Sequence, residues 1–383
     1  MSGLKHENRT KVALITSQAH SLSNFRGPLM QEMISRGCTV YALAPDHDEA
    51  SRARLNGLGV ITVDFSMSRT GMNPFRDLVD VFKLASALKK VSPEIVLSYA
   101  MKPVIYGSIA ALLVGIPQRF ALIAGLGHAF ATPFGRCSIK QRIGRFLAKY
   151  MLAIAFKACA GIIFQNEEDR DEFVLTGHLD VKKTIRTNGT GVDLEKFIQL
   201  PLPKGPITFL MAARLIRPKG VFEFAEAAKR VKAIYPSSHF ILLGGIDANP
   251  EGLTQSEIEN LVKSADIEWP GHVDNVIPYF LRSHVFVLPS YYREGVPRAS
   301  QEALACGRAI ITTDNVGCRE TVTPQNGIII PIKDADALTT AMINILNNRE
   351  IIGKYADHSR IFAKQKFNVV DVNSNILFFM KIF

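Results

Sequence analysis

The sequence predicts an α/β protein made of two doubly wound, Rossmann-like domains that face each other across a cleft. Short apolar runs alternate with stretches of helical periodicity, which is the pattern of βαβ units on a parallel sheet. The alternation stops at a run rich in proline, residues 200–206, and then starts again. A chain of 383 residues is long enough for two domains with sizeable cores.

The first half of the chain alternates in the order expected of a doubly wound domain. Apolar runs predict strands at 11–17, 39–44, 60–65, 95–98, 119–123 and 161–165. Helical spacing predicts helices at 25–36, 78–91 and 106–114. We therefore assign residues 1–200 to an N-terminal domain.

The same alternation returns after the proline-rich run. Apolar runs predict strands at 207–212, 239–243, 285–288, 309–312 and 327–330. Helical spacing predicts helices at 222–234, 253–264, 277–283 and 337–347. We assign residues 201–365 to a C-terminal domain, which leaves 366–383 as a terminal segment.

The composition predicts a folded body in a reducing compartment. Hydrophobic residues make up 47% of the chain, which argues against disorder. The five cysteines are odd in number and lack paired metal-ligand spacing, so we expect reduced thiols in a cytoplasmic protein. Residues 1–10 are polar and charged, so we expect no signal peptide.

Positive charge is concentrated in the N-terminal half. Residues 1–200 hold 25 Lys and Arg against 17 Asp and Glu, and no acid occurs between Glu94 and Glu167. Anionic lipid headgroups or a lipid diphosphate would be attracted there. Nucleic acid is the competing partner, but no recognised nucleic-acid module is visible, so we expect none to bind.

Residues 138–158 have the pattern of a basic amphipathic helix. Lys140, Arg142, Arg145 and Lys149 interleave with apolar residues, so the segment can lie in the plane of a membrane surface. The alternative is a core helix whose cations extend to solvent. The longest apolar candidate for a membrane span, 104–123, is broken by Pro117, Gln118 and Arg119. We expect surface attachment and no transmembrane span.

Two glutamates, Glu294 and Glu302, flank a predicted strand–loop–helix junction. The apolar run 285–288 predicts the strand, and Pro297 suits the first helical turn because its missing N–H costs nothing there. Eight helical positions at about 100° each bring the two carboxylates to neighbouring sides of the axis. A capping acid beside an ordinary surface glutamate is the alternative interpretation.

The entry to this helix is a candidate anion site. The N–H groups of Gly295, Val296 and Arg298 can point at an anion, helped by the helix dipole. An anion cradle flanked by two carboxylates suits a nucleotide-sugar, because the diphosphate needs donors and the hydroxyls need acceptors.

A second motif supports the nucleotide-sugar interpretation. The apolar strand 207–213 is followed by Arg214 and Lys219, and a helix opens near Gly220. Arginine offers a fork of donors and lysine a point charge, a common pairing around a diphosphate. A solvated basic turn is the alternative, but the order strand, Arg, Lys-Gly and then the glutamate pair is improbable by chance.

These motifs together resemble the family 4 retaining glycosyltransferases, which have the two-domain GT-B fold. The resemblance covers essentially the whole chain and is closest to bacterial members that extend sugars on undecaprenyl diphosphate. Supporting stretches are 23–29, 102–107, 122–130, 189–193, 244–250 and 317–321. The resemblance implies an acceptor-binding N-terminal domain, a nucleotide-sugar-binding C-terminal domain, and a last segment that crosses back to the first.

The resemblance also implies roles for individual residues. Arg214 and Lys219 would stabilise the diphosphate as the sugar–phosphate bond breaks. Glu302 would accept hydrogen bonds from ribose hydroxyls, and Glu294 would hold the donor sugar. The complete implied donor site is Arg214, Lys219, His272, Val273, Glu294, Gly295, Val296, Pro297 and Glu302; a plain turn is the alternative for the residues around His272.

The N-terminal domain supplies candidates for the acceptor. Asn24, Arg26 and Lys102 lie beyond predicted strands, with Arg26 and Lys102 facing the acceptor diphosphate; surface charge is the alternative. His128 follows two glycines that permit a close backbone approach, so it is a candidate for binding the sugar or a phosphate. A structural histidine is the alternative there.

The expected reaction is transfer of a hexose or N-acetylhexosamine from a UDP-sugar to a polyprenyl-diphosphate-linked saccharide, with retention. We infer front-face substitution, because double displacement would need a nucleophile that is not identifiable. Two cations at the diphosphate remove the need for a metal or other cofactor. The pair Asp334 and Asp336 resembles a metal motif but precedes a helix, so capping accounts for it better. The expected place is the inner face of the cell membrane.

Three alternatives stay open. A GT-B nucleotide-sugar epimerase or hydrolase would turn over the UDP-sugar with no lipid acceptor. A nicotinamide dehydrogenase would need Gly-x-Gly-x-x-Gly after the first strand, where this chain has residues 17–21, Ser-Gln-Ala-His-Ser. A non-catalytic membrane-binding module would tolerate loss of Arg214 and Glu294.

Overall fold

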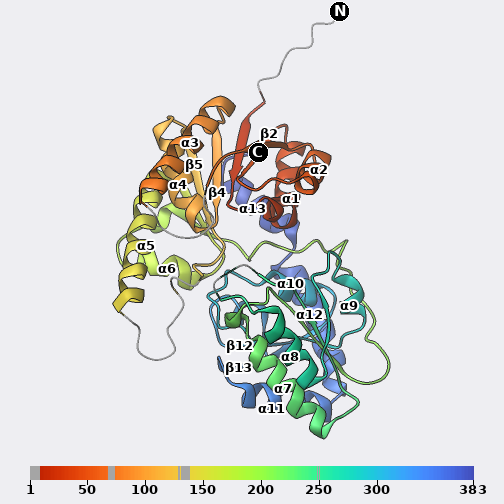
Figure 1. Ribbon diagram of the computed structural model, residues 1–383. Helices are drawn as coiled ribbons and strands as arrows, with labels where there is room; N and C mark the ends of the chain where they lie inside the picture. Colours follow the sequence, from red (N-terminus) through yellow and green to blue (C-terminus); the bar gives the residue numbers. More distant parts are fainter. Residues whose placement is uncertain (1–8, 68–73, 128–129, 131–138, 248, 250) are drawn as a thin grey trace, which may run out of the picture. The chain divides into compact units, whose positions relative to one another are not determined.

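The computed structural model describes residues 9–67, 74–127, 130, 139–247, 249 and 251–383 (Figure 1). These residues divide into two compact units. The first holds the described residues up to 127 together with 139–190 and 371–383. The second holds Phe130 and the described residues of 191–370.

The first unit is built on a seven-stranded parallel sheet. The strand order is β3-β2-β1-β4-β5-β6-β7. The strands are β1 (Lys11–Ile15), β2 (Thr39–Ala44), β3 (Ile61–Asp64), β4 (Ile95–Tyr99), β5 (Gln118–Ile123), β6 (Gly161–Phe164) and β7 (Thr184–Arg186). All six predicted strands are confirmed, and β7 is an addition.

Helices cover both faces of this sheet. They are α1 (Ala19–Ser35), α2 (Glu49–Gly57), α3 (Pro74–Val91), α4 (Met101–Leu113), α5 (Ile139–Ala158), α6 (Glu167–Val174), a short η2 (Val181–Lys183) and α13 (Val369–Phe379). Figure 1 shows α3, α4 and α5 on one side of the sheet and α1, α2 and α13 on the other. Buried side chains of the second group pack on alternate strand residues, such as Val12 and Leu14, which share one face.

Helix α1 begins at Ala19, well before the predicted start at residue 25. The backbone N–H of Ala19 donates to the carboxylate of Asp46 at 2.6 Å. Asp46 follows β2, so a residue distant in sequence satisfies the first turn of α1. That contact is tertiary, which is why the local pattern placed the helix start too late.

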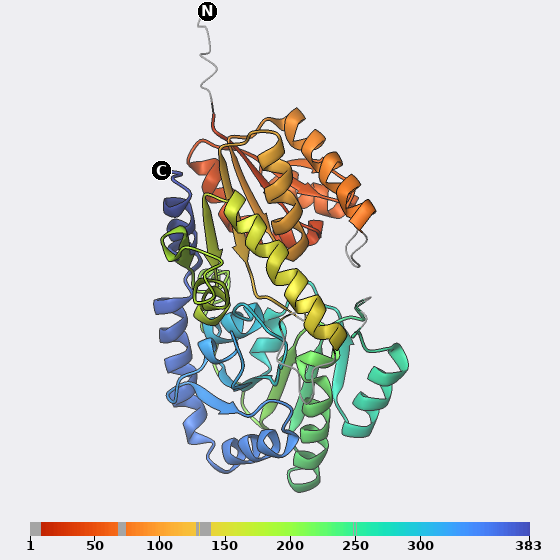
Figure 2. The ribbon, with the colours of Figure 1, turned by 90° about the vertical axis from the view of Figure 1, so that its left-hand side faces the viewer.

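The second unit repeats the same topology with six parallel strands. Their order is β10-β9-β8-β11-β12-β13, which matches the first six positions of the other sheet. The strands are β8 (Thr208–Ala212), β9 (His239–Leu243), β10 (Glu268–Gly271), β11 (Val285–Leu288), β12 (Ala309–Thr313) and β13 (Gly327–Ile330). The five predicted strands are confirmed, and Figure 2 shows this unit from the side.

The helical elements of the second unit lie between these strands and after the last one. They are η3 (Arg217–Lys219), α7 (Val221–Ile234), α8 (Gln255–Ala265), α9 (Ile277–Leu281), α10 (Arg298–Ala305), η4 (Arg319–Thr321), α11 (Ala335–Asn347) and α12 (Glu350–Lys366). The core is a single cluster of buried side chains that includes Phe209, Phe240 and Phe286, one from each of three neighbouring strands.

The chain passes from the first unit to the second at residues 190 and 191, before the predicted boundary at 200. The reason is hydrogen bonding to α12 and to the residue that follows it. The N–H of Val192 donates to the Phe367 carbonyl at 2.7 Å, and a guanidinium N–H of Arg360 donates to the Phe197 carbonyl at 2.6 Å. The proline-rich run lies inside the second unit, where buried Arg308 donates to the Leu200 carbonyl at 3.2 Å.

The last residues, 371–383, belong to the first unit. Phe379 of α13 meets Phe120 of β5 edge to face, with ring centroids 5.8 Å apart. The guanidinium of Arg36, after α1, donates to the Ile382 carbonyl at 2.9 Å. The terminal helix is therefore part of the first unit's core, although it follows the whole second unit in sequence.

The cysteines in the described part of the chain, Cys38, Cys159, Cys306 and Cys318, are buried free thiols, and Cys137 lies outside the described residues. Among the helices of the described ranges, none combines the length and the apolar character that a membrane crossing requires.

Candidate active site

The predicted cations and the first glutamate meet at one edge of the second sheet. Strand order reverses between β8 and β11, so these neighbouring strands send their following loops in opposite directions. Such a switch point, at the carboxyl ends of parallel strands, is where open α/β sheets bind ligands. Arg214 and Lys219 follow β8, and Glu294 follows β11. The tertiary structure thus brings together residues 75 to 80 positions apart in sequence.

Lys219 and Glu294 form an ion pair shielded from water. The ammonium of Lys219 donates to Oε1 of Glu294, and each residue keeps 9% of its surface exposed. The hydroxyl of Ser290 donates to the same carboxylate oxygen at 3.0 Å. A buried carboxylate with two donors on one oxygen is held in a single orientation.

The loop after β8 and the loop after β11 are locked together by their backbones. The carbonyl of Pro218 accepts from the N–H groups of Tyr291 at 2.8 Å and Tyr292 at 3.0 Å. Gly220 ends η3 with φ of 81°, and a Cβ there would lie 2.2 Å from the carbonyl oxygen of Pro289. Only glycine fits this contact, so the Pro-Lys-Gly sequence both turns the chain and aims Lys219 at Glu294.

A third loop closes on the same place. Gly317, after β12, has φ of 76°, and a Cβ there would lie 2.0 Å from the carbonyl oxygen of Gly295. The side-chain amide of Asn315 donates to the Tyr292 carbonyl at 2.7 Å. The loops after β8, β11 and β12 therefore form one packed platform that holds Glu294.

Arg214 stands at the more exposed side of this platform. Its Nη1 lies 3.7 Å from Oδ2 of Asp247, and the side chain is 46% exposed. The guanidinium lies 5.7 Å from the ring centroid of Tyr292, and the ammonium of Lys219 lies 5.6 Å from the same centroid. One aromatic ring thus holds two cations beside each other, an arrangement that favours a multiply charged anion.

Glu302 lies on α10, where the guanidinium of Arg298 donates to its Oε1 at 2.8 Å. Burial raises the pKa of Glu302 above its ordinary value, and the charge of Arg298 opposes that rise. The side chain keeps 13% of its surface exposed. Glu302 is therefore a positioned acceptor with one oxygen already engaged.

The residues before α10 form its capping turn. Pro297 is the N-cap, with extended backbone, so it stands one position before the predicted first helical turn. Gly295 and Val296 lie on the preceding loop, and the Val296 carbonyl accepts from the side chain of Gln301 at 3.1 Å. Proline lacks a backbone N–H, so no intrahelical hydrogen bond is lost whether Pro297 stands at the N-cap or at the first helical position.

His272 and Val273 follow β10, at the same edge of the sheet as the loop after β9. The N–H of Gly244 donates to the Gly271 carbonyl at 2.9 Å. The imidazole of His272 is 76% exposed, and its Nε2 lies 3.9 Å from Asp274. The predicted loop is present, with its histidine turned to solvent.

Two of the acceptor candidates lie near the carboxyl end of β4 in the first unit. The guanidinium of Arg26 lies 5.2 Å from the ring centroid of Tyr99, the last residue of β4, and Arg26 is 3% exposed. Lys102 is in the first turn of α4 and lies 3.3 Å from Asp77. Asn24 is exposed on α1, and His128 lies outside the described residues.

Several contacting residues escaped the sequence interpretation. Ser290, Tyr292 and Asp247 each touch a predicted site residue. The sequence analysis named Arg298 for its backbone N–H but not for the contact of its side chain with Glu302. Asp247 and Tyr292 lie in or beside stretches already singled out, so proximity to those motifs was the available signal. The sequence could not show which oxygen or ring each residue contacts, because those contacts form between loops that follow different strands.

The Asp-x-Asp sequence is a helix cap, as predicted. The side chain of Asp334 accepts from the N–H of Ala337 at 2.8 Å, and Asp336 pairs with Arg230. Within the described ranges, no group of three or more His, Cys, Asp or Glu side chains is placed to hold a metal ion.

Two parallel sheets that share one doubly wound strand order define an α/β protein of two Rossmann-like domains. The family models agree. Residues 11–166 match the glycosyl transferase 4-like model, and residues 193–364 match the model of glycosyl transferases group 1.

Two curated relatives align with most of the chain. An N,N'-diacetylbacillosaminyl-diphospho-undecaprenol alpha-1,3-N-acetylgalactosaminyltransferase of Campylobacter jejuni is 30% identical over 89% of this chain and 90% of its own. A UDP-Gal:alpha-D-GlcNAc-diphosphoundecaprenol alpha-1,3-galactosyltransferase of Escherichia coli is 28% identical over 77% of each chain. The chain therefore belongs to the glycosyltransferase family that these relatives and the two matching models represent.

The fold agrees with that membership. The structure of the Anabaena protein HepE, solved with UDP-glucose, superposes with a TM-score of 0.77 at 14% identity, over 98% of this chain and all of the other. At this identity the likeness shows the fold alone, which is the GT-B arrangement of two Rossmann-like domains predicted from the sequence.

Proposed function

We propose that this glycosyltransferase moves a hexose or N-acetylhexosamine from a UDP-sugar to an undecaprenyl-diphosphate-linked saccharide, with retention of configuration. The observation that carries the proposal is the ion pair of Lys219 with Glu294 at the switch point of the second sheet, with Arg214 beside Lys219 over the Tyr292 ring. The names of the two aligned relatives supply the acceptor class, and one of them supplies the UDP donor.

The ion pair suggests how donor binding is coupled to the site. Without a ligand, the ammonium of Lys219 is satisfied by Glu294. A diphosphate placed between Lys219 and Arg214 would compete for that ammonium because it carries more charge. Oε1 of Glu294 would then accept a hydrogen bond from a sugar hydroxyl in place of the one from the ammonium. The same exchange would orient the sugar only when the diphosphate is bound.

The two cations would act mainly on the transition state. Negative charge grows on the leaving diphosphate as the sugar–phosphate bond lengthens, so donors fixed in advance lower the barrier. In front-face substitution the leaving phosphate takes the proton of the acceptor hydroxyl. Arg214 and Lys219 supply the charge that a divalent metal supplies elsewhere, so the proposed reaction requires no metal.

The proposed acceptor site lies at the switch point of the first sheet, beside Tyr99 at the end of β4. Lys102 is the candidate for direct contact, since its ammonium is only 3.3 Å from a carboxylate that a lipid diphosphate could outcompete. Arg26 is buried against Tyr99, so we assign it the positioning of that ring and a longer-range charge. Asn24 and His128 stay candidates for the saccharide.

Because the proposed acceptor is a lipid, we propose that the enzyme acts at a membrane surface, the inner face of the cell membrane. Helix α5 fits that surface. Its outward side carries Ile139, Ile143 and Phe146, between 55% and 76% exposed, and lysine and arginine residues lie between them. Burying such side chains in the interface would remove apolar area from water, and the cations would meet anionic headgroups.

The test is a transfer assay with detergent-solubilised protein, a panel of UDP-sugars and undecaprenyl-diphosphate-linked GlcNAc or GalNAc. We expect a lipid-linked product that forms with chelator present and is lost in Arg214→Ala. The matched control is Arg217→Ala, which removes an exposed arginine of η3 paired with Glu257 and leaves transfer near the parent rate. UDP-sugar turnover without a lipid product would instead indicate an epimerase or hydrolase.

A further inference from the structure

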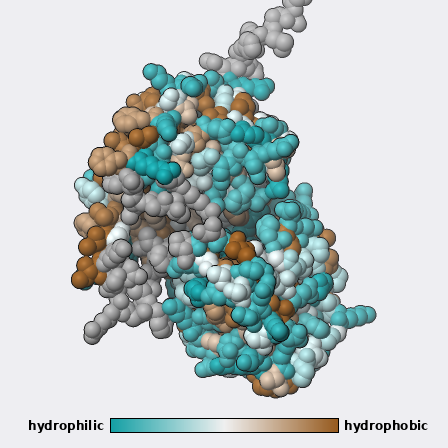
Figure 3. Space-filling view, in the orientation of Figure 1, coloured by the Kyte–Doolittle hydropathy of each residue, from teal (hydrophilic) through white to brown (hydrophobic). Residues whose placement is uncertain are grey.

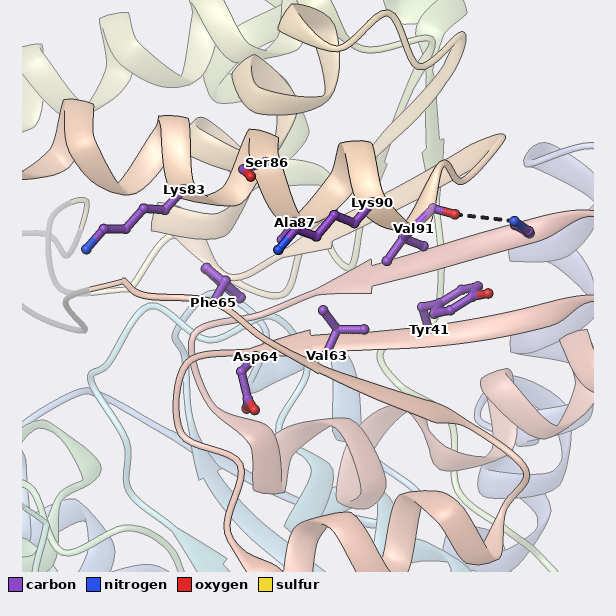
Figure 4. A pocket seen from close by; sticks show the side chains of 10 residues that line it. Tyr41, Val63, Asp64, Phe65, Lys83, Ser86, Ala87, Lys90 and Val91 are labelled. Atoms are coloured by element: carbon purple, nitrogen blue, oxygen red, sulfur yellow. Dashed lines mark hydrogen bonds between the residues drawn. The ribbon is translucent and has the colours of Figure 1, made fainter.

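A groove in the first unit lies outside both proposed substrate sites. It has a volume of about 560 Å³ and runs between α3 and the edge of the sheet formed by β2 and β3 (Figure 4). Val63 and Phe65 lie under α3 on the strand side of the groove, and Tyr41 lies further along. Its lining thus joins residues of α3 to residues of β2 and of the edge strand β3.

Lysines line this apolar groove. Lys83 and Lys90 of α3 are seven positions apart, so they stand on one side of the helix roughly 10 Å from each other. Neither forms an ion pair with any residue that the structure describes. Lys11 lies at the far end, where its ammonium is 3.5 Å from the Val91 carbonyl.

Asp64, the acid among the described residues that line the groove, does not neutralise these lysines. Figure 4 shows the carboxylate of Asp64 pointing away from α3. Both of its oxygens accept from the guanidinium of Arg52, at 2.7 and 2.6 Å. The groove therefore keeps a positive charge against an apolar wall, which suits an anion that carries apolar groups.

An apolar stripe on α3 lies next to the groove. Phe75, Leu78, Val79 and Phe82 recur at helical spacing and are between 50% and 85% exposed. Figure 3 shows apolar side chains gathered over the part of the surface that α3 and α5 occupy in Figure 1. An exposed apolar stripe of this kind marks an interaction surface.

We propose that α3 is a second membrane contact of this protein and that its groove binds the phosphate of an anionic phospholipid headgroup. The stripe would enter the interface beside α5, with α4 packed between the two helices. The headgroup phosphate would lie between Lys83 and Lys90, with its glycerol against Val63 and Phe65. The proposal extends the membrane attachment proposed above, but it does not depend on the transfer reaction.

The test measures binding of the full chain to vesicles of phosphatidylcholine alone and of phosphatidylcholine with a quarter phosphatidylglycerol. Lys83→Ala/Lys90→Ala is compared with Lys89→Ala/Lys182→Ala, which removes the same charge from exposed lysines of the same unit that do not line the groove. We expect the groove variant to lose at least tenfold in binding to the anionic vesicles, the control less than threefold, and neither to change on phosphatidylcholine.

Other outcomes would overturn the proposal. Equal losses in the two double variants would mean general surface charge instead of a site, and no loss would mean that α3 stays off the membrane. Displacement from vesicles by inorganic phosphate, at matched ionic strength, would assign the groove to a soluble anion. A dimer in sedimentation analysis that dissociates in Phe75→Ser/Phe82→Ser would mean that a second copy covers the stripe.

The folded state and the donor site are checked in the same variants. The melting temperature and its shift with UDP should equal those of the parent chain, since the described residues that line the groove all belong to the first unit. Loss of vesicle binding with an intact UDP shift supports the inference even if the transfer reaction has been misassigned. Loss of both would point to misfolding. The Lys83→Arg/Lys90→Arg variant keeps the charge, so it distinguishes a loss of charge from a loss of the fold.

Discussion

The two units share one strand order but present different surfaces. In the second unit, the loops that follow three neighbouring strands pack together around a buried ion pair. In the first unit, the helices α3, α4 and α5 carry most of that unit's exposed large hydrophobic side chains among the described residues. One strand order therefore carries two different kinds of surface, because loops and outer helix faces can change without altering the sheet.

The largest expected effect breaks the second unit's ion pair. Lys219→Ala would leave Glu294 buried without its cation, which costs about 3–5 kcal/mol of stability. Transfer should fall about 10²- to 10³-fold because a donor to the diphosphate is lost. Lys219→Ala/Glu294→Ala should recover much of the stability and none of the transfer, measured by denaturant unfolding and initial rates. Recovery of both would make the pair purely structural.

The next effect concerns the packed loops of the second unit. Gly317→Ala puts a Cβ 2.0 Å from the Gly295 carbonyl oxygen, so the loop that holds Glu294 must move. We expect about 2–4 kcal/mol of destabilisation and a loss of the UDP-induced melting shift. Gly353→Ala, in α12 with nothing within 4 Å of the new Cβ, should raise stability by about 0.5–1 kcal/mol. A harmless Gly317→Ala would show that the loops are loosely packed.

Acid should destabilise the second unit through His284. Burial lowers its pKa to about 4, and the neutral ring accepts from the Thr208 N–H at 3.1 Å and donates to the Pro203 carbonyl at 3.0 Å. The unfolded chain would take the proton near pH 6.5, so stability is full above that value and falls as the pH drops toward 4.

The loss should reach about 2–3 kcal/mol across that window. Unfolding curves from pH 7 to pH 4 measure it, and His284→Gln should flatten the pH dependence. The matched control is His358→Gln, which replaces an exposed histidine of α12 and should keep the parent slope. Equal slopes in all three chains would assign the acid sensitivity to other groups.

The smallest effect tests the first unit's apolar surface. Phe146→Ser on α5 removes a side chain that is 69% exposed, so folding should be unaffected while vesicle binding falls about tenfold. Ile361→Ser, on α12 of the second unit and 49% exposed, should leave vesicle binding unchanged. Equal effects of the two changes would remove the distinction between the units' surfaces.

Local pattern predicted most of the elements because each depends on periodicity that a short window contains. The strand over 39–44 has the predicted bounds, and α7 starts one residue before its prediction. Elements anchored by distant partners were placed less well. Helix α1 is capped by Asp46 from another strand end, and residues 191–200 join the second unit through Phe367 and Arg360.

The sequence by itself determined the two βαβ repeats, the order of Arg214, Lys219, Glu294 and Glu302, and the basic character of the first unit. Periodicity and motif order are local properties, so they can be read along the chain. Only the tertiary structure decided that Lys219 meets Glu294, that Tyr292 lies beside both cations, and that Lys83 and Lys90 face an open sheet edge. Those contacts depend on which strands become neighbours, and that is a property of the whole fold.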